Sequence, residues 1–160
     1  MPRTFRVSEP FRNEKRVQAG KSEKQVARCP KCGLVFQDGL WKRSTEKKAP
    51  RRRAKLCPAC VQIKGGLAGG VVQLGGTFAA LHRQELLNRI RNVETTVADE
   101  RPLERIIDIK EKDGEILISA TTEHLVARIG KAIQRDFGGK LQLKYAPEDK
   151  FATARWRRDV

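Results

Sequence analysis

Two closely spaced cysteine pairs constrain this sequence more than any other feature. Cys29-Pro-Lys-Cys32 and Cys57-Pro-Ala-Cys60 are both C-x-x-C motifs, and together they hold all four cysteines of the chain. Each motif brings two thiolates to one side of a metal, and two motifs complete the tetrahedral set of sulfur ligands that zinc prefers. We therefore predict that Cys29, Cys32, Cys57 and Cys60 bind one structural Zn²⁺. A shell of four thiolates leaves no open position for catalysis.

Two other interpretations of the cysteine pairs remain open, namely disulfides and a thioredoxin-like redox motif. Residues 1–28 contain no apolar run typical of a secretory leader, and no stretch approaches the roughly 20 apolar residues that cross a bilayer. We therefore expect a cytoplasmic protein, and the reducing cytoplasm disfavours disulfides. A redox motif is typically a single pair beside a βαβ unit rather than two matched pairs.

Positive charge is concentrated in the first part of the chain. The net charge is +15, and residues 1–64 carry 18 Lys and Arg against 5 acidic residues, whereas residues 65–160 carry 16 against 14. This contrast predicts parts with different roles. We expect a flexible basic tail at 1–28, a zinc-binding module with a basic loop at 29–64, and an α+β domain at 65–160.

The segment between the cysteine pairs has the densest positive charge. Residues 42–55 contain eight Lys or Arg and one Glu. A loop this basic is either a solvated chain without a partner or a surface for phosphate. Trp41, where the segment begins, either stacks on a base or packs on the zinc core. The predicted RNA-binding residues are Trp41, Lys42, Arg43, Lys47, Lys48, Arg51, Arg52, Arg53 and Lys55.

Hydrophobic periodicity after residue 70 predicts the order β-α-β-β-α-β with one extra strand. This order is typical of a ferredoxin-like domain, in which two helices cover one face of an antiparallel sheet. Asp113-Gly114 is the turn of a tight hairpin, Thr121 or Thr122 caps the second helix, and Gly138-Gly139 ends it. The strands are expected at 71–74, 103–110, 115–119, 141–145 and 151–156, and the helices at 80–97 and about 122–137.

No group of residues in the sequence suggests catalysis. His82 and His124, the only histidines, each lie alone on a predicted helix, where we expect a surface or packing role for both. The glycine pairs match neither of the common phosphate-binding motifs. We expect no enzymatic activity and no small-molecule substrate.

Several of these motifs, taken in order, resemble a known family. The chain is similar over about residues 28–158 to one zinc unit and the following α/β domain of the NMD-three family, the archaeal and eukaryotic export adaptor of the large ribosomal subunit. The resemblance implies binding to ribosomal RNA or the large subunit, by a short, bacterial-type member. The residues that carry it are Cys29-Pro-Lys-Cys-Gly33, Gly39-Leu-Trp41, Cys57-Pro-Ala-Cys60, Gly65-Gly66, Val71-Val72-Gln73-Leu74, the helix with Ala127, Ile129, Ala132 and Ile133, and Phe137-Gly138-Gly139-Lys140.

The sequence thus favours a non-enzymatic, zinc-stabilised RNA-binding protein that acts on the large ribosomal subunit or its assembly intermediates. Two alternatives belong to other classes. One is a zinc-ribbon DNA-binding regulator, although no recognition helix is predicted between the cysteine pairs. The other is an interaction adaptor whose basic tail binds an acidic protein.

Overall fold

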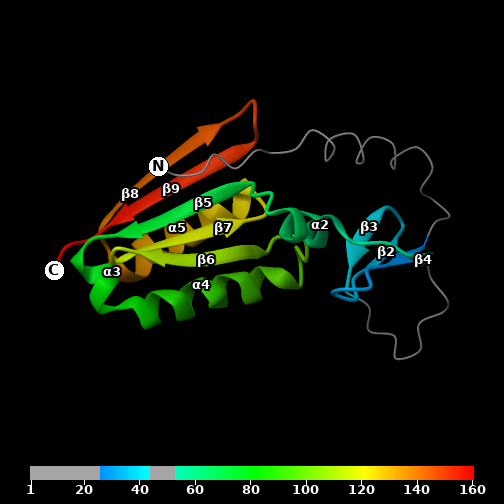
Figure 1. The fold of residues 1–160 in the computed structure, drawn as a ribbon, viewed down its shortest axis with the longest axis horizontal. Helices are drawn as coiled ribbons and strands as arrows, with labels where there is room; N and C mark the ends of the chain where they lie inside the picture. The colour runs from blue at the N-terminus through cyan, green and yellow to red at the C-terminus, as the bar shows by residue number, and fades with distance from the viewer. Residues whose placement is uncertain (1–25, 44–52) are drawn as a thin grey trace.

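The chain folds around two separate β-sheets. A computed structural model describes residues 26–43 and 53–160. Figure 1 shows a small sheet at one end of the molecule and a larger sheet at the other, with the helix α2 (Pro58–Gly65) between them. The smaller unit, residues 26–43 and 53–65, contains all four cysteines and is called the metal module below. None of the helices in the described residues is both long and apolar enough to span a bilayer.

The metal module is built on four very short strands. Their order across the sheet is β3-β2-β1-β4. The pairs β1–β2 and β2–β3 are antiparallel, whereas β4 adds parallel to β1. The strands are β1 (Ala27–Arg28), β2 (Val35–Gln37), β3 (Leu40–Lys42) and β4 (Arg53–Ala54).

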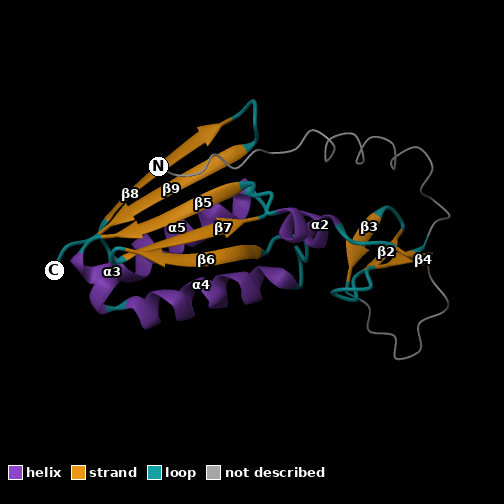
Figure 2. Ribbon diagram, in the orientation of Figure 1, coloured by secondary structure: helices purple, strands orange, loops and turns teal. Residues whose placement is uncertain are grey.

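The α+β domain has a five-stranded sheet with helices on one face. Figure 2 shows α5 behind the strands and α4 along the β6 side. The buried residues of the central strands alternate with less buried ones, as expected for a sheet covered on one side. The strands are β5 (Gly70–Gly75), β6 (Ile106–Lys112), β7 (Glu115–Ala120), β8 (Lys140–Ala146) and β9 (Phe151–Arg157), and the helices are α3 (Thr77–Leu81), α4 (Arg83–Ala98) and α5 (Glu123–Phe137).

The α+β class and the order of elements along the chain agree with the sequence prediction, but the ferredoxin-like order in space is not confirmed. The strands lie in the order β6-β7-β5-β9-β8. The extra strand β9 is inserted between β5 and β8, and it runs parallel to β5. Its buried residues Ala152 and Ala154 are small, and a Cβ added at Gly130 of α5 would lie 3.3 Å from that of Ala154. Small side chains at this contact let α5 pass close over β9.

Local sequence rules set the ends of several elements. Asp113 and Gly114 both have positive φ values, 53° and 79°, as the predicted tight hairpin requires. Thr122 caps α5, because its hydroxyl accepts a hydrogen bond of 3.1 Å from the Leu125 N–H. The helix predicted at 80–97 is divided into α3 and α4 at His82, whose ring stacks on Phe78 with centroids 4.1 Å apart.

The main hydrophobic core lies entirely within the α+β domain. Its buried side chains fall between Val72 and Trp156, and none comes from the metal module. Trp156 is the largest of them, and its indole N–H donates to the Gly138 carbonyl over 2.7 Å. The burial of this apolar surface supplies the main driving force for folding the domain.

We therefore predict that residues 66–160 fold without the metal module. A fragment of these residues should show one cooperative thermal transition by far-UV circular dichroism, and a metal chelator should not shift it. A fragment without a transition would contradict this prediction.

Candidate metal centre

The sulfur atoms of all four cysteines converge on one point of the metal module. They lie within 4.8 Å of one another, and the Cys32 and Cys57 Sγ atoms are 3.6 Å apart. Ligands about 2.3 Å from a tetrahedral metal are about 3.8 Å apart, whereas a disulfide is only about 2.05 Å long. All four cysteines are free thiols. The cluster can therefore hold one metal ion.

The first cysteine pair lies in a tight turn after β1. The Cys29 N–H donates to the Leu34 carbonyl over 2.8 Å, and the Gly33 N–H donates to the Cys29 carbonyl over 3.0 Å. Gly33 has a φ of 81°, a conformation that residues with a Cβ rarely adopt. This glycine lets the chain reverse directly after Cys32, so that both sulfurs face the same side.

The second cysteine pair opens α2, a helix that the sequence patterns did not predict. Cys57 is its N-cap residue, and the Cys57 sulfur accepts a hydrogen bond of 3.4 Å from the Cys60 N–H. Pro58 fills the first helical position, where a missing N–H costs nothing. A helix N-terminus also favours negative charge, which suits a thiolate.

The surroundings change the acidity of the thiols in opposite directions. Burial alone would raise the pKa of Cys29, but hydrogen bonds with backbone groups of Cys57, Cys32 and Lys31 lower it to about 6. Burial raises the pKa of Cys57 and of Cys60 above the ordinary thiol value. A metal must displace the protons of such buried thiols when it binds.

A cation from the α+β domain reaches the sulfur cluster. The guanidinium of Arg105 donates to the Cys32 sulfur over 3.2 Å and to the Cys60 sulfur over 3.4 Å. A longer contact of 3.8 Å joins it to the Cys57 sulfur. Burial alone would lower the pKa of Arg105, but these sulfur partners raise it. Four thiolates around a divalent ion carry a net charge of −2, and Arg105 offsets part of that charge.

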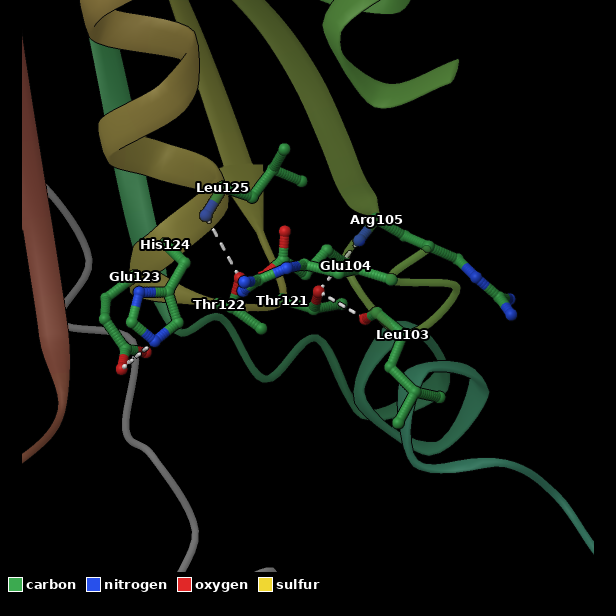
Figure 3. Close-up of polar contacts among 9 residues, drawn as sticks. Leu103, Glu104, Arg105, Thr121, Thr122, Glu123, His124 and Leu125 are labelled. Atoms are coloured by element: carbon green, nitrogen blue, oxygen red, sulfur yellow. Dashed lines mark hydrogen bonds and ion pairs between the residues drawn. The ribbon is translucent and has the colours of Figure 1, made fainter. Parts of the chain in front are cut away.

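Backbone and hydroxyl contacts hold Arg105 in this position. Its N–H donates to the Thr121 hydroxyl over 2.9 Å, and its Nε donates to the Pro102 carbonyl over 2.9 Å. The Thr121 hydroxyl in turn donates to the Leu103 carbonyl over 2.8 Å. In Figure 3, the Arg105 side chain extends away from Thr121. Leu103 itself packs against the buried cysteines. Leu103 and Arg105 thus each connect the α+β domain to the metal module.

A cleft of about 560 Å³ opens where the two units meet. The guanidinium groups of Arg28, Arg43 and Arg105 line it, as do the carboxylates of Glu94 and Glu104. Charges of both signs thus line the cleft, which does not select a purely anionic ligand.

Two carboxylates near the cleft have guanidinium partners. Arg43 forms an ion pair of 3.0 Å with Asp99 at the end of α4. One Glu104 oxygen pairs with Arg101 over 3.4 Å, whereas the other is buried without a partner among the described residues.

The structure describes only some of the predicted phosphate-binding residues. Lys42 and Arg43 at the end of β3, Arg53 on β4 and the adjacent Lys55 are all exposed. Four others lie outside the described residues: Lys47, Lys48, Arg51 and Arg52.

Trp41 packs against the small core of the metal module. Its ring centroid is 5.3 Å from that of Phe36, and the side chain contacts the cluster of buried cysteines. It is half-buried. Of the two roles considered for Trp41, packing on the small core is therefore present. Base stacking by the exposed part of the ring stays a prediction.

Sequence reasoning missed Arg105 entirely. It lies 45 residues after Cys60 and belongs to no motif, since it directly precedes a β-branched strand. Only the pairing of β6 with β7 and the network around Thr121 bring it to the cysteines.

No protein-family model matches this sequence, and no curated protein or solved structure matches it either. The resemblance to the NMD-three family therefore stays a prediction. The functional argument rests on the residues themselves.

We predict that the four thiols bind one metal ion per chain. A Cys57→Ser protein should lose the metal, because it removes one of four ligands, while the α+β domain keeps its thermal transition. Elemental analysis measures the first result and circular dichroism the second. Full metal content in the variant would contradict the assignment.

We also predict that Arg105 strengthens metal binding. Arg105→Gln should lower metal affinity by about 10–100-fold, the usual effect of removing a group that supports metal ligands. Competition with a chromophoric chelator measures it. Arg128→Gln is the matched control, because Arg128 is an exposed arginine of α5 and, among the described residues, makes no hydrogen bond to any of the four cysteine sulfurs. Equal affinities for both variants would show that Arg105 is dispensable.

Proposed function

We propose that this protein is a zinc-stabilised, non-enzymatic RNA-binding protein that associates with the large ribosomal subunit or its assembly intermediates. One observation carries most weight: the two ends of the basic segment are fixed at opposite edges of a sheet that the cysteine cluster supports. The remaining support comes from charge, from the donor set of the cluster and from the family resemblance.

Zinc is the metal that best fits the cysteine cluster. Four thiolates within 4.8 Å of one another are a soft, tetrahedral donor set. Few other groups stabilise the module, because its buried cluster consists of Cys29, Leu34, Cys57, Ala59 and Cys60. Most of its folding free energy would then come from metal binding, as in small zinc domains.

The small sheet presents the ends of the basic segment on a fixed base. Lys42 lies at the end of edge strand β3, and Arg53 lies on the opposite edge strand β4. Three strand spacings, about 14 Å, separate these edges. Cations held on both sides of a sheet can contact several phosphates at once, and each contact adds affinity that depends on salt.

The ribosome is the proposed partner because of the resemblance and the chemistry together. Ribosomal RNA is a polyanion that a strongly basic module binds through phosphates, without reading sequence. Specificity would then come from shape or from the α+β domain. Zinc would act only on structure, since the four thiolates leave no position for a substrate.

The proposal predicts a salt-dependent contribution from the arginine run at the end of the basic segment. Replacing Arg51, Arg52 and Arg53 by Gln removes three cations, so the slope of log K against log salt should flatten by about 0.7–0.9 per lost phosphate contact. The loss should be similar for unrelated RNA sequences. Fluorescence anisotropy across a salt series measures it.

The matched control removes three cations from the helices instead. Arg91, Arg128 and Lys131 are exposed on α4 and α5, and their replacement by Gln changes the net charge equally. This control variant should leave the slope unchanged.

Cosedimentation in a sucrose gradient with purified large subunits tests whether the ribosome is the partner. Binding to duplex DNA tests the alternative of a DNA-binding regulator. Binding to DNA but not to RNA would refute the proposal.

A further inference from the structure

The face of the five-stranded sheet that the helices leave open has a marked excess of positive charge. Residues that are paired in register across neighbouring strands point to the same face. The register places Gln142, Arg155, Gln73, Leu117 and Lys110 in one row across all five strands. None of these is fully buried, whereas their neighbours along the strands, such as Leu74 and Ile118, are core residues. This row therefore faces away from the helices.

Contacts between side chains confirm this assignment of the face. Gln73 donates to Glu115 over 2.7 Å, and a Cβ added at Gly75 would also meet Glu115. Glu111, one residue from Lys110, instead forms an ion pair with Arg83 of α4 on the helix side. The open face thus carries six exposed cations and two carboxylates: Lys110, Lys112, Lys140, Lys144, Arg155 and Arg157, with Asp108 and Glu115.

This excess is notable because residues 65–160 as a whole are nearly neutral, with 16 Lys and Arg against 14 acidic residues. The remainder of the domain must therefore carry more acidic than basic residues. Lys140, Lys144 and Arg155 form no ion pair among the residues that the structure describes. Uncompensated like charges on one surface attract a polyanion.

The cations form two groups, separated by central strands whose one charged side chain on this face is Glu115. Lys110 and Lys112 lie on the edge strand β6, and the other group lies on β8 and β9. Three strand spacings, about 14 Å, separate β6 from β9. The other central side chains are Val71, Gln73, Leu117 and Ser119, none of which has an aromatic ring for stacking on an unpaired base.

We propose that this open face is a second RNA-binding surface, and that it binds the sugar-phosphate backbones of double-helical RNA. Duplex RNA displays two phosphate strands on either side of a wide, shallow minor groove, and proteins bind it by shape and backbone contacts. The two cation groups fit the two backbones, and the central strands, which carry no cation on this face, lie over the groove between them. This inference rests on the proposed RNA-binding function but concerns the α+β domain instead of the metal module.

The test uses the full, metal-loaded chain and an RNA duplex of about 20 base pairs. One variant carries Lys140→Gln, Lys144→Gln and Arg155→Gln, and a second carries Lys110→Gln and Lys112→Gln. For each, the slope of log K against log salt should flatten by about 0.7–0.9 per lost phosphate contact. The control is again the helix variant of Arg91, Arg128 and Lys131, which should match the wild type.

Thermal transitions must coincide for all variants, so that altered binding is not caused by unfolding. Equal slopes for the sheet variants and the helix control would overturn the inference. So would an effect seen with single-stranded RNA but not with the duplex, or with polyglutamate but not with RNA. If the variant of Arg51, Arg52 and Arg53 binds weakly while the sheet variants bind normally, only this inference fails. If the wild-type chain binds no RNA, the proposed function fails with it.

Discussion

Four thiols brought within 4.8 Å of one another must lose their protons to bind a metal, and the resulting negative charges repel. Two positively charged groups can offset this repulsion: a metal ion bound by the four sulfurs, and one guanidinium. That guanidinium belongs to Arg105, which contacts the sulfurs of Cys32 and Cys60. Arg105 directly precedes β6 of the α+β domain. The charge of the cysteine cluster therefore contributes to the position of the metal module against the α+β domain, together with the Leu103 packing and the Arg43–Asp99 ion pair.

The sequence was most informative where chemistry depends on short spacing. The two C-x-x-C motifs, the Asp113-Gly114 hairpin and a helix cap at Thr121 or Thr122 were all recognisable, because neighbouring residues alone determine them. The ligand set of the candidate site was thus predictable in full. Its supporting arginine was not, because Arg105 reaches the cysteines only through the tertiary fold.

The order of the strands in space shows the same limit. The sequence predicted β9 as one more strand, yet a strand pattern does not distinguish an edge position from a central one. Ala152 and Ala154 lie beneath α5. The close contact between α5 and β9 depends on the tertiary fold, so the sequence pattern alone does not show it. Similarly, the basic segment was visible as composition, whereas the cations of the open face are scattered over three strands and only the register gathers them.

The insertion of β9 into the middle of the sheet has a consequence for the order of events during synthesis. Gly70 of β5 pairs with Ala152 of β9, so more than 80 residues separate partners that lie side by side. Until β9 has left the ribosome, β8 has no neighbour in the sheet, and the growing chain holds only the β6-β7-β5 part. Closing so long a loop carries an entropic cost that delays folding. The nascent chain can thus complete its metal module first. The edge of β5 that later pairs with β9 stays unpaired until β9 is synthesised.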